Sequence, residues 1–330
     1  MAKTWREGSF FSDFNVKYIE TVTDELVNRF LFLIKGLFDY TVALIIGCPF
    51  VYIHSSSYNS FRRKSLFICI ALLFRTKIIL HIHPSHFYQF LSECRGLEKR
   101  FIYFLLKRID IFVVITEEMK KNIQKLLPDK QIIILRNPID LDKMENSGSY
   151  KRLSDRILYL GWYIKEKGVY ELVDAIEILI NNSVKIQADF YGAKKIDKLR
   201  SYVENKGLKE KIRINGWINN GKKLKALYEC TALILPSHSE GVPNVILEAM
   251  ATKTPIISTL VGGLKEILRD GENAFITEVN NPKDLSRKIL KCLVDKELRD
   301  KLAGYAYQNV CMQNDVKKIK KDFEKIVERL

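Results

Sequence analysis

Cysteine is scarce in this 330-residue sequence, and its spacing is irregular. There is no Cys-x-x-Cys pair, and the six cysteines are spread over the whole chain: Cys48, Cys69, Cys94, Cys230, Cys292 and Cys311. This distribution argues against a disulfide scaffold and against a cysteine-based zinc site. It predicts small, buried thiols in a reducing compartment.

A long apolar run is also missing. The most apolar stretch, residues 41–53, is interrupted by Gly47 and Pro49 and is shorter than the about 20 residues that span a bilayer. Residues 1–8 are too polar for a secretory signal. We therefore expect a cytoplasmic chain, either soluble or peripheral at the inner face of the plasma membrane. No Gly-x-Gly-x-x-Gly follows a predicted strand, which argues against a dehydrogenase-like dinucleotide binder.

Positive charge, in contrast, is abundant. The chain has 54 Lys+Arg against 39 Asp+Glu, a formal net charge of +15, and this excess predicts an anionic partner. No RNA- or DNA-binding signature accompanies it, so a nucleic-acid partner is not expected. Each basic cluster alone is typical of a solvated helix face, but together they predict docking on an anionic membrane surface. The clusters are Arg62-Arg63-Lys64, Lys99-Arg100 and Lys107-Arg108.

The length and the pattern of apolar residues predict two α/β domains. A chain of this length exceeds one ordinary core and suits two domains of about 150 residues. Short apolar runs alternate with helical segments, which indicates parallel sheets. An early strand at 15–19 and a helix over 24–38 are expected first. The further predicted strands are 50–54, 77–83, 111–115, 131–135, 157–160, 185–191, 212–214, 232–235 and 255–259.

The stretch 237–248, SHSEGVPNVILE, is the main candidate site. It follows an apolar run that ends at Pro236, so Glu240 is expected on a loop at a strand's carboxyl end and Glu248 within the next helix. The residues between them, Gly241, Val242, Pro243 and Asn244, let backbone approach a ligand and place a helix N-terminus beside an anion. The alternative is purely structural, because acids are common near helix starts.

A second junction of the same kind follows. Residues 255–259 read as a strand, and Gly262 and Gly263 then open another turn toward a helix. Consecutive strand–loop–helix junctions at carboxyl ends are where doubly wound sheets bind nucleotides.

The stretch PSHSEGVPNVILEAMATKTPIISTLVGGLKEILRDGENAFI resembles the donor-binding core of retaining glycosyltransferase family 4, with its Glu-x7-Glu motif. The resemblance implies a GT-B fold, in which two Rossmann-like domains face each other across a cleft. It implies an acceptor-side domain over 1–147, a nucleotide-sugar donor domain over 148–311, and a C-terminal helix, 312–330, that packs back on the first domain. The family's first glycine-rich strand–turn–helix has no counterpart, so we expect an incomplete N-terminal domain.

The resemblance also implies roles for individual residues. Glu248 would accept hydrogen bonds from the ribose, and Glu240 with the backbone after it would hold the sugar. Lys167, with the amides of Gly262 and Gly263, would neutralise the diphosphate. Gly161, Trp162 and Trp217 would line the nucleotide. Trp162 replaces the arginine that the family carries, and Lys165 is a poor substitute, since an ammonium does not reproduce a bidentate guanidinium. No cofactor and no metal is expected.

A histidine of the first domain is implied at the donor as well. His83 ends a predicted strand at the family's histidine position, although Pro84 replaces the usual glycine. His81 is expected inside the domain and His86 on the acceptor side or in solvent. A zinc site of His81, His83 and His86 is the alternative, which the lack of an adjacent fourth ligand disfavours.

The expected function is therefore transfer of a sugar from a nucleotide diphospho-sugar to a hydroxyl acceptor, with retention and without a metal. The resemblance favours a lipid-linked saccharide or a growing polysaccharide as acceptor. The alternative is a truncated, inactive nucleotide-sugar-binding remnant or partner subunit, which Trp162 and the missing N-terminal unit favour.

Overall fold

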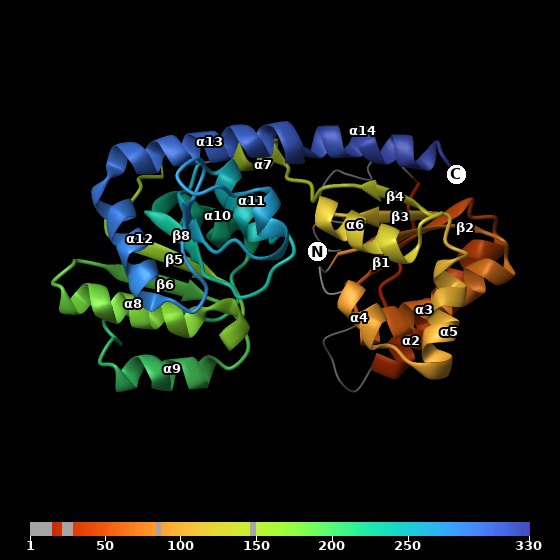
Figure 1. Cartoon of the computed structure of the whole chain (residues 1–330), viewed down its shortest axis with the longest axis horizontal. Coiled ribbons are helices and arrows are strands. Elements are labelled where there is room, and N and C mark those ends of the chain that lie inside the picture. The colour runs from red at the N-terminus through yellow and green to blue at the C-terminus, as the bar shows by residue number, and fades with distance from the viewer. Residues whose placement is uncertain (1–14, 22–28, 84–86, 146–149) are drawn as a thin grey trace. The chain divides into compact units, whose positions relative to one another are not determined.

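The computed structural model describes residues 15–21, 29–83, 87–145 and 150–330 (Figure 1). The contacts divide the chain into two compact units, Met1–Arg136 with Lys317–Leu330, and Asn137–Val316. The predicted boundary after residue 147 thus falls inside the second unit, and the chain returns to the first unit at Lys317 rather than at residue 312.

The first unit is built on a parallel sheet. Its strands are β1 (Phe50–Ser55), β2 (Lys77–Ile82), β3 (Ile111–Val114) and β4 (Gln131–Ile134). Within the described residues they lie in the order β1-β2-β3-β4, which is also their order in the sequence. All four residues of β3 are buried, as expected for a parallel strand covered on both faces.

Helices complete this unit. They are α2 (Arg29–Ile45), α3 (Asn59–Leu73), α4 (Phe87–Glu93), α5 (Gly96–Leu106), α6 (Glu117–Leu126) and α14 (Val316–Val327). Both α2 and α5 pack on α3, and the three lie together in Figure 1. The start of α6 is fixed by Thr116, whose hydroxyl accepts a hydrogen bond from the Met119 amide. The ring of Phe323 on α14 lies 5.0 Å from that of Tyr52 on β1.

The strand predicted at 15–19 is wrong. Residues 15–21 have no regular structure, and Val16 and Tyr18 are exposed. A five-residue alternation forms a strand only when a neighbouring strand satisfies its backbone, and none pairs with it among the described residues. Residues 24–28 of the helix predicted over 24–38 lie outside the described residues. The part that is described, α2, continues to Ile45.

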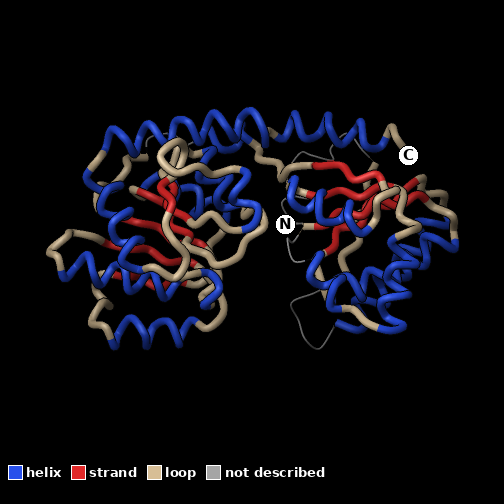
Figure 2. Tube along the Cα trace, viewed as in Figure 1, coloured by secondary structure: helices blue, strands red, loops and turns tan. Residues whose placement is uncertain are grey.

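The second unit contains a six-stranded parallel sheet (Figure 2). Its strands are β5 (Arg156–Leu160), β6 (Gln187–Tyr191), β7 (Ile212–Asn215), β8 (Ala232–Leu235), β9 (Ile256–Ser258) and β10 (Phe275–Ile276). Their spatial order is β10-β9-β8-β5-β6-β7. The chain therefore starts in the middle of the sheet, builds one side, and returns to build the other. The strand order reverses between β5 and β8, which is the topological switch point of a doubly wound sheet.

The helical segments of this unit are α7 (Leu141–Glu145), η2 (Lys165–Lys167), α8 (Val169–Asn181), α9 (Ile196–Asn205), α10 (Asn220–Glu229), α11 (Asn244–Ala251), η3 (Gly262–Glu266), α12 (Pro282–Val294) and α13 (Lys296–Asn314). Helix α8 packs on α12, and α11 packs on α13. The core includes three fully buried rings, those of Tyr159, Tyr163 and Phe190. The prediction of α/β architecture with parallel sheets is confirmed.

The ends of the second unit lie side by side. The Ile139 amide donates to the Asn314 carbonyl at 2.8 Å, and the Val316 amide donates to the Ile139 carbonyl at 2.9 Å. The side chain of Asn314 also donates to the Asn137 carbonyl at 2.9 Å. The segments that enter and leave this unit are thus joined by hydrogen bonds.

Among the described residues, no helix combines the length and the apolar composition that crossing a lipid bilayer requires.

Candidate functional site

The switch point brings two loops together at the carboxyl ends of β5 and β8, which pair with each other. Gly168 ends the first loop with a φ of +67°, and a Cβ there would lie 2.0 Å from the carbonyl oxygen of Pro236 in the second. Only glycine permits this approach. The amide of His238 donates to the Glu166 carbonyl at 3.0 Å, which ties the loops together a second time.

Glu240 and Lys167 meet across these loops. The Nζ of Lys167 lies 2.6 Å from Oε1 of Glu240, and the hydroxyl of Ser237 donates to the same oxygen at 2.8 Å. Glu240 is only 9% exposed, so its carboxylate needs such partners to be buried at all. The residue assigned to the donor's sugar and the residue assigned to its diphosphate are therefore in direct contact.

Tyr159 lies close enough to Glu240 to feel its charge. Burial raises the pKa of Tyr159 well above its usual range, and the nearby charge of Glu240 raises it further. The phenol therefore stays protonated and donates to the Trp162 carbonyl at 2.8 Å. This bond fixes the loop that begins at Gly161.

The diglycine turn packs directly on the backbone after Glu240. Gly262 has a φ of +50°, and a Cβ there would lie 1.9 Å from the Glu240 carbonyl oxygen. A Cβ on Gly263 would lie 2.5 Å from the Gly241 carbonyl oxygen and 2.8 Å from Val242 Cγ2. The Gly263 amide donates to the Glu240 carbonyl at 3.3 Å. The two predicted junctions thus face each other. Neither Gly262 nor Gly263 leaves room for a side chain.

Glu248 forms an ion pair with a lysine that the sequence analysis did not identify. Glu248 lies on α11 and is 8% exposed, and the Nζ of Lys223 on α10 is 2.7 Å from its Oε1. Nothing in the local sequence distinguishes Lys223 from its neighbour Lys222, because the choice depends on how α10 packs beside α11. Pro243 caps α11 from the position before the first helical residue, one place earlier than predicted.

Asn137 is a further residue that the sequence did not reveal. Its side-chain nitrogen donates to the Val242 carbonyl at 3.0 Å, and it is almost fully buried. The loop that carries Val242 is therefore held in place by Asn137, the first residue of the unit. A polar residue beside Pro138 was the available signal, but it is equally typical of a turn.

The predicted aromatic residues lie at the surface. Gly161 follows β5, and its amide donates to the Tyr191 carbonyl at 3.1 Å. Trp162 is 43% exposed, with the Nζ of Lys194 3.4 Å from the centre of its ring. Trp217 follows β7 and is 74% exposed. Both rings are accessible to a ligand at this edge of the sheet, while neither has a contact that fixes it to Glu240.

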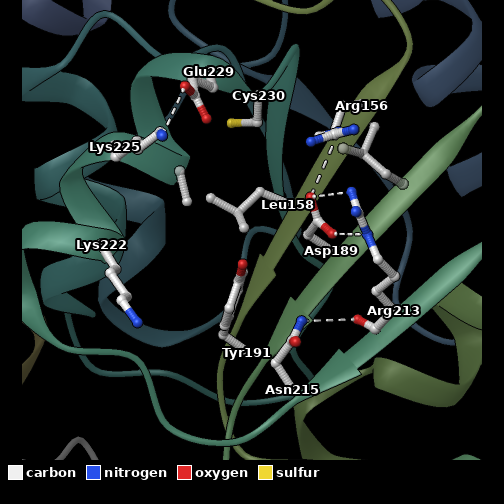
Figure 3. A pocket seen from close by; sticks show the side chains of 12 residues that line it. Arg156, Leu158, Asp189, Tyr191, Arg213, Asn215, Lys222, Lys225, Glu229 and Cys230 are labelled. Carbon is white, nitrogen blue, oxygen red and sulfur yellow. Dashed lines mark hydrogen bonds and ion pairs between the residues drawn. The ribbon is translucent and has the colours of Figure 1, made fainter. Parts of the chain in front are cut away.

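A hollow of about 370 Å³ lies elsewhere in this unit, over β5, β6, β7 and α10 (Figure 3). Its lining shares no residue with the predicted site. Asp189 in its wall is paired with Arg213 at 2.7 Å and with Arg156 at 3.6 Å. Because ligands of doubly wound sheets bind at the switch point, the site there is the stronger candidate.

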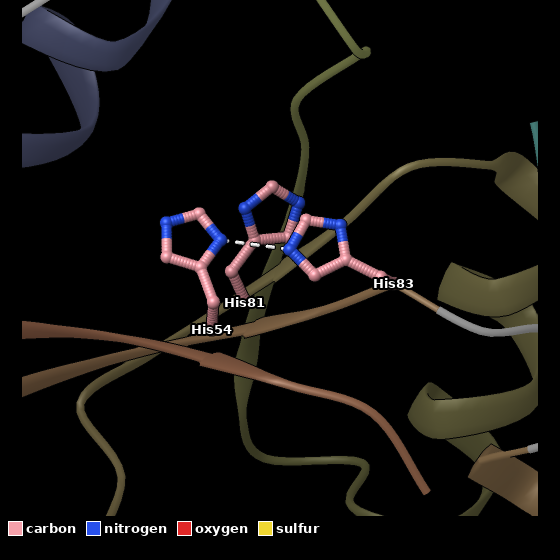
Figure 4. Close-up of side chains that lie close together, drawn as sticks. All are labelled: His54, His81 and His83. Carbon is pink, nitrogen blue, oxygen red and sulfur yellow. Dashed lines mark hydrogen bonds between the residues drawn. The ribbon is translucent and has the colours of Figure 1, made fainter. Parts of the chain in front are cut away.

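In the first unit, the described histidines cluster. His81 is fully buried, as expected, and His83 follows β2 with its ring 4.0 Å from that of His81 (Figure 4). The Nε2 of His83 is 2.7 Å from Nδ1 of His54, a residue that the sequence analysis did not single out. Burial, followed by nearby charge, lowers the pKa of His54 to about 3 and those of the other two well below their usual value. All three imidazoles are therefore neutral. His86 lies outside the described residues.

Comparison with known sequences gives two informative relatives. An uncharacterized glycosyltransferase of Methanocaldococcus jannaschii is 30% identical over 238 residues, which are 71% of this chain and 64% of the relative. A capsular polysaccharide biosynthesis glycosyltransferase of Staphylococcus aureus is 24% identical over 221 residues, 61% of this chain and 58% of the relative. The chain thus spans less than two thirds of each.

Solved structures share the fold. Anabaena HepE in complex with UDP-glucose matches with a TM-score of 0.72 at 16% identity, covering 94% of this chain and 86% of that one. Sucrose-phosphate synthase from Thermosynechococcus elongatus gives a TM-score of 0.72 at 16% identity, covering 96% and 81%. The GT-B fold expected from the sequence is confirmed. The model of the family described as glycosyl transferases group 1 matches residues 142–309, half of the chain, and with the shared fold this shows that the chain belongs to the glycosyl transferases group 1 family.

Proposed function

We propose that this chain is a glycosyltransferase that moves a sugar from a nucleoside diphosphate sugar to a hydroxyl acceptor, with retention and without a metal ion at the diphosphate. The observation that carries the proposal is the contact between Lys167 and Glu240 at the switch point, backed by the diglycine turn. Ligands of doubly wound sheets bind at this place.

The chemistry follows from the groups present. Lys167 has three donors, so it can keep Glu240 and still contact a phosphate oxygen. The N-terminus of α11 adds a positive dipole on the same loop. Together they would stabilise the negative charge that develops on a departing diphosphate. Glu240 is then placed to accept hydrogen bonds from sugar hydroxyls, and Glu248 from the ribose.

The relatives support the substrate class. One solved neighbour holds UDP-glucose, and one relative acts in capsular polysaccharide biosynthesis. We extend this to a nucleotide-sugar donor and a saccharide acceptor, lipid-linked or polymeric, for this chain. The role of His83 toward the donor sugar stays a prediction.

The surface of the first unit supports docking on an anionic membrane. Helices α2 and α5, which both pack on α3, expose large apolar side chains to solvent: Phe30, Leu31, Ile34, Phe38, Leu97, Phe101 and Phe104. Exposed cations lie among those of α5, namely Lys99, Arg100, Lys107 and Arg108. Apolar groups combined with basic ones match a lipid surface that carries negative headgroups, at about 1 kcal/mol per cation.

The docking is tested with vesicles. The full chain should co-sediment with phosphatidylcholine vesicles only when they contain an anionic lipid. The double variant Lys99→Glu/Arg100→Glu should weaken this binding at least about tenfold. Lys198→Glu/Lys209→Glu, which reverses two exposed lysines of the second unit, is the matched control and should bind as the parent does. Equal loss in both variants would mean that net charge alone is responsible.

The activity is tested on the purified chain with a panel of nucleoside diphosphate sugars. Release of the nucleoside diphosphate should occur with one donor class, and the anomeric configuration of the product, read by NMR, should equal that of the donor. Glu240→Ala should abolish release. Glu204→Ala, which removes an exposed carboxylate paired with Lys209, should leave it unchanged. No release with any donor, despite donor binding, contradicts the proposal.

A second candidate is a nucleotide-sugar-binding protein without turnover. It is favoured by Trp162, which stands where the family has an arginine and offers only a ring beneath Lys194 to the diphosphate. The two candidates separate in the same assay, because this one predicts donor binding by titration calorimetry with no release of nucleoside diphosphate.

A further inference from the structure

Three histidines of the first unit converge on one point. His54 lies on β1 opposite His81 on β2 in the strand register, and His83 lies two residues beyond His81, so the pleat turns all three to the same face. One ring nitrogen of each lies within 4.8 Å of the others. Figure 4 shows the three rings gathered above the ends of the two strands.

The donor set is chemically specific. Within the part of the chain that the structure describes, it contains three imidazoles and no carboxylate or thiolate. Nδ1 of His54 and Nε2 of His83 lie 2.7 Å apart, so these two rings already turn a nitrogen toward the same point. Three imidazoles with one position left open are a set that binds Zn²⁺ in tetrahedral sites, whereas Mg²⁺ and Ca²⁺ require oxygen ligands.

We propose that His54, His81 and His83 form a binding site for a divalent transition-metal ion, Zn²⁺ foremost. Zn–N bonds of about 2.0–2.1 Å in a tetrahedron separate the ligand nitrogens by about 3.3 Å. The 2.7 Å contact between His54 and His83 must therefore widen slightly. The ring that donates this hydrogen bond moves its proton to its other nitrogen, so the ion binds without net loss of a proton from the cluster.

Tyr52 is the outer partner of this site. Its hydroxyl lies 2.5 Å from Nδ1 of His81. When that nitrogen carries the proton and donates to the Tyr52 oxygen, Nε2 is the ligating atom of His81. A ligating histidine usually has a partner of this kind, which fixes the tautomer and the ring orientation.

The positive charge of Lys64 opposes the ion. Lys64 is close enough to act on His54, and its ammonium donates to the Thr21 hydroxyl at 2.8 Å. Like charges repel, so Lys64 weakens the site. This gives a signed test, because removing the charge should tighten metal binding while the loss of any ligand loosens it.

The experiment uses the full chain, stripped with a chelator and dialysed. Co²⁺ serves as the spectroscopic probe, and Zn²⁺ is added in competition. We expect one Co²⁺ per chain, with the intense visible absorption of a tetrahedral ion, displaced by one Zn²⁺. His54→Gln and His83→Gln should each lose this spectrum, and Tyr52→Phe should keep it with an affinity about 10–100-fold lower. Lys64→Gln should bind several-fold more tightly than the parent.

His238→Gln, which removes the one described histidine of the second unit, is the control and should bind as the parent does. Circular dichroism confirms that each variant is folded, and His81 is left unchanged because it is fully buried. The proposal is overturned if the parent chain takes up no stoichiometric Co²⁺ or Zn²⁺. It is equally overturned if His86→Gln abolishes binding while His54→Gln retains it, because the ligands are then a different set. None of these readouts depends on glycosyl transfer.

Discussion

The two sheets of this protein place polar side chains in different ways. In the second unit the strand order reverses between β5 and β8, and the loops after these strands meet at the reversal. In the first unit the described strands follow one another in sequence order, and the histidines meet through strand register instead. A reversal creates a crevice for a ligand, whereas register stacks side chains on one face.

The two units also bury polar groups differently. In the second, each buried glutamate of the site is paired with a lysine, Glu240 with Lys167 and Glu248 with Lys223. In the first, one buried imidazole and two half-buried ones contact one another and are neutral. Charged pairs suit the recognition of an anion with hydroxyls, while neutral nitrogens suit a metal ion. The difference in chemistry therefore matches the difference in proposed ligand.

The largest expected effect comes from the close backbone contact between the two loops at the switch point. Gly168→Ala places a Cβ 2.0 Å from the Pro236 carbonyl oxygen at a φ of +67°, so it should lower the free energy of unfolding by more than about 4 kcal/mol. Gly207 has nearly the same φ, +68°, with open space around it. Gly207→Ala should cost only about 1–2 kcal/mol. Urea denaturation measures both, and equal losses would show that the loop contact is not rigid.

Removing the site lysine should separate recognition from stability. Lys167→Met should lower kcat/KM for the donor about 10²–10³-fold, because a cation at the leaving group is lost. Lys206 is its matched control, since it makes an ion pair of the same length, 2.6 Å, and its side chain is 22% exposed against 23% for Lys167. Lys206→Met should change stability alone. Steady-state kinetics measure both variants. Similar losses of kcat/KM in Lys167→Met and Lys206→Met would contradict a role of the switch-point lysine at the donor.

Near neutral pH the smallest effect concerns the histidines. Their pKa values are lowered in the folded chain, that of His54 from 6.5 to about 3, so the unfolded chain takes up protons first as the pH falls. Stability should therefore be full above pH 6.5 and decline below it, each ring contributing up to about 1.4 kcal/mol per pH unit. His54→Gln should reduce the slope of the free energy of unfolding against pH by the contribution of one ring, up to about 1.4 kcal/mol per pH unit. Thermal unfolding between pH 4 and 8 in a chelator measures this, and an unchanged slope would contradict the burial of His54.

The sequence predicted those parts of the structure that rest on local signals. The strand Ala232–Leu235 has the predicted bounds, because Pro236 ends it. Gly262 and Gly263 stood out because glycine is needed where backbones touch. The role of each site residue toward a ligand stays a prediction.

What the sequence missed depends on contacts between distant segments. Lys223 becomes a partner of Glu248 only through the packing of α10, and His54 joins His81 only through the register of β1 and β2. Asn137 reaches the Val242 loop across 105 positions of sequence. The early strand at 15–19 failed for the same reason, since a strand is defined by a partner that its own residues do not reveal.

The neighbouring ends of the second unit have a consequence for how such a protein can be rebuilt. Because Ile139 is joined to Asn314 and Val316, residues 137–316 form an insert whose two cut points are adjacent. Segments with adjacent ends are the ones that domain insertion and circular permutation tolerate. The second unit is thus a cassette, exchangeable for another of the same topology by two cuts at neighbouring points.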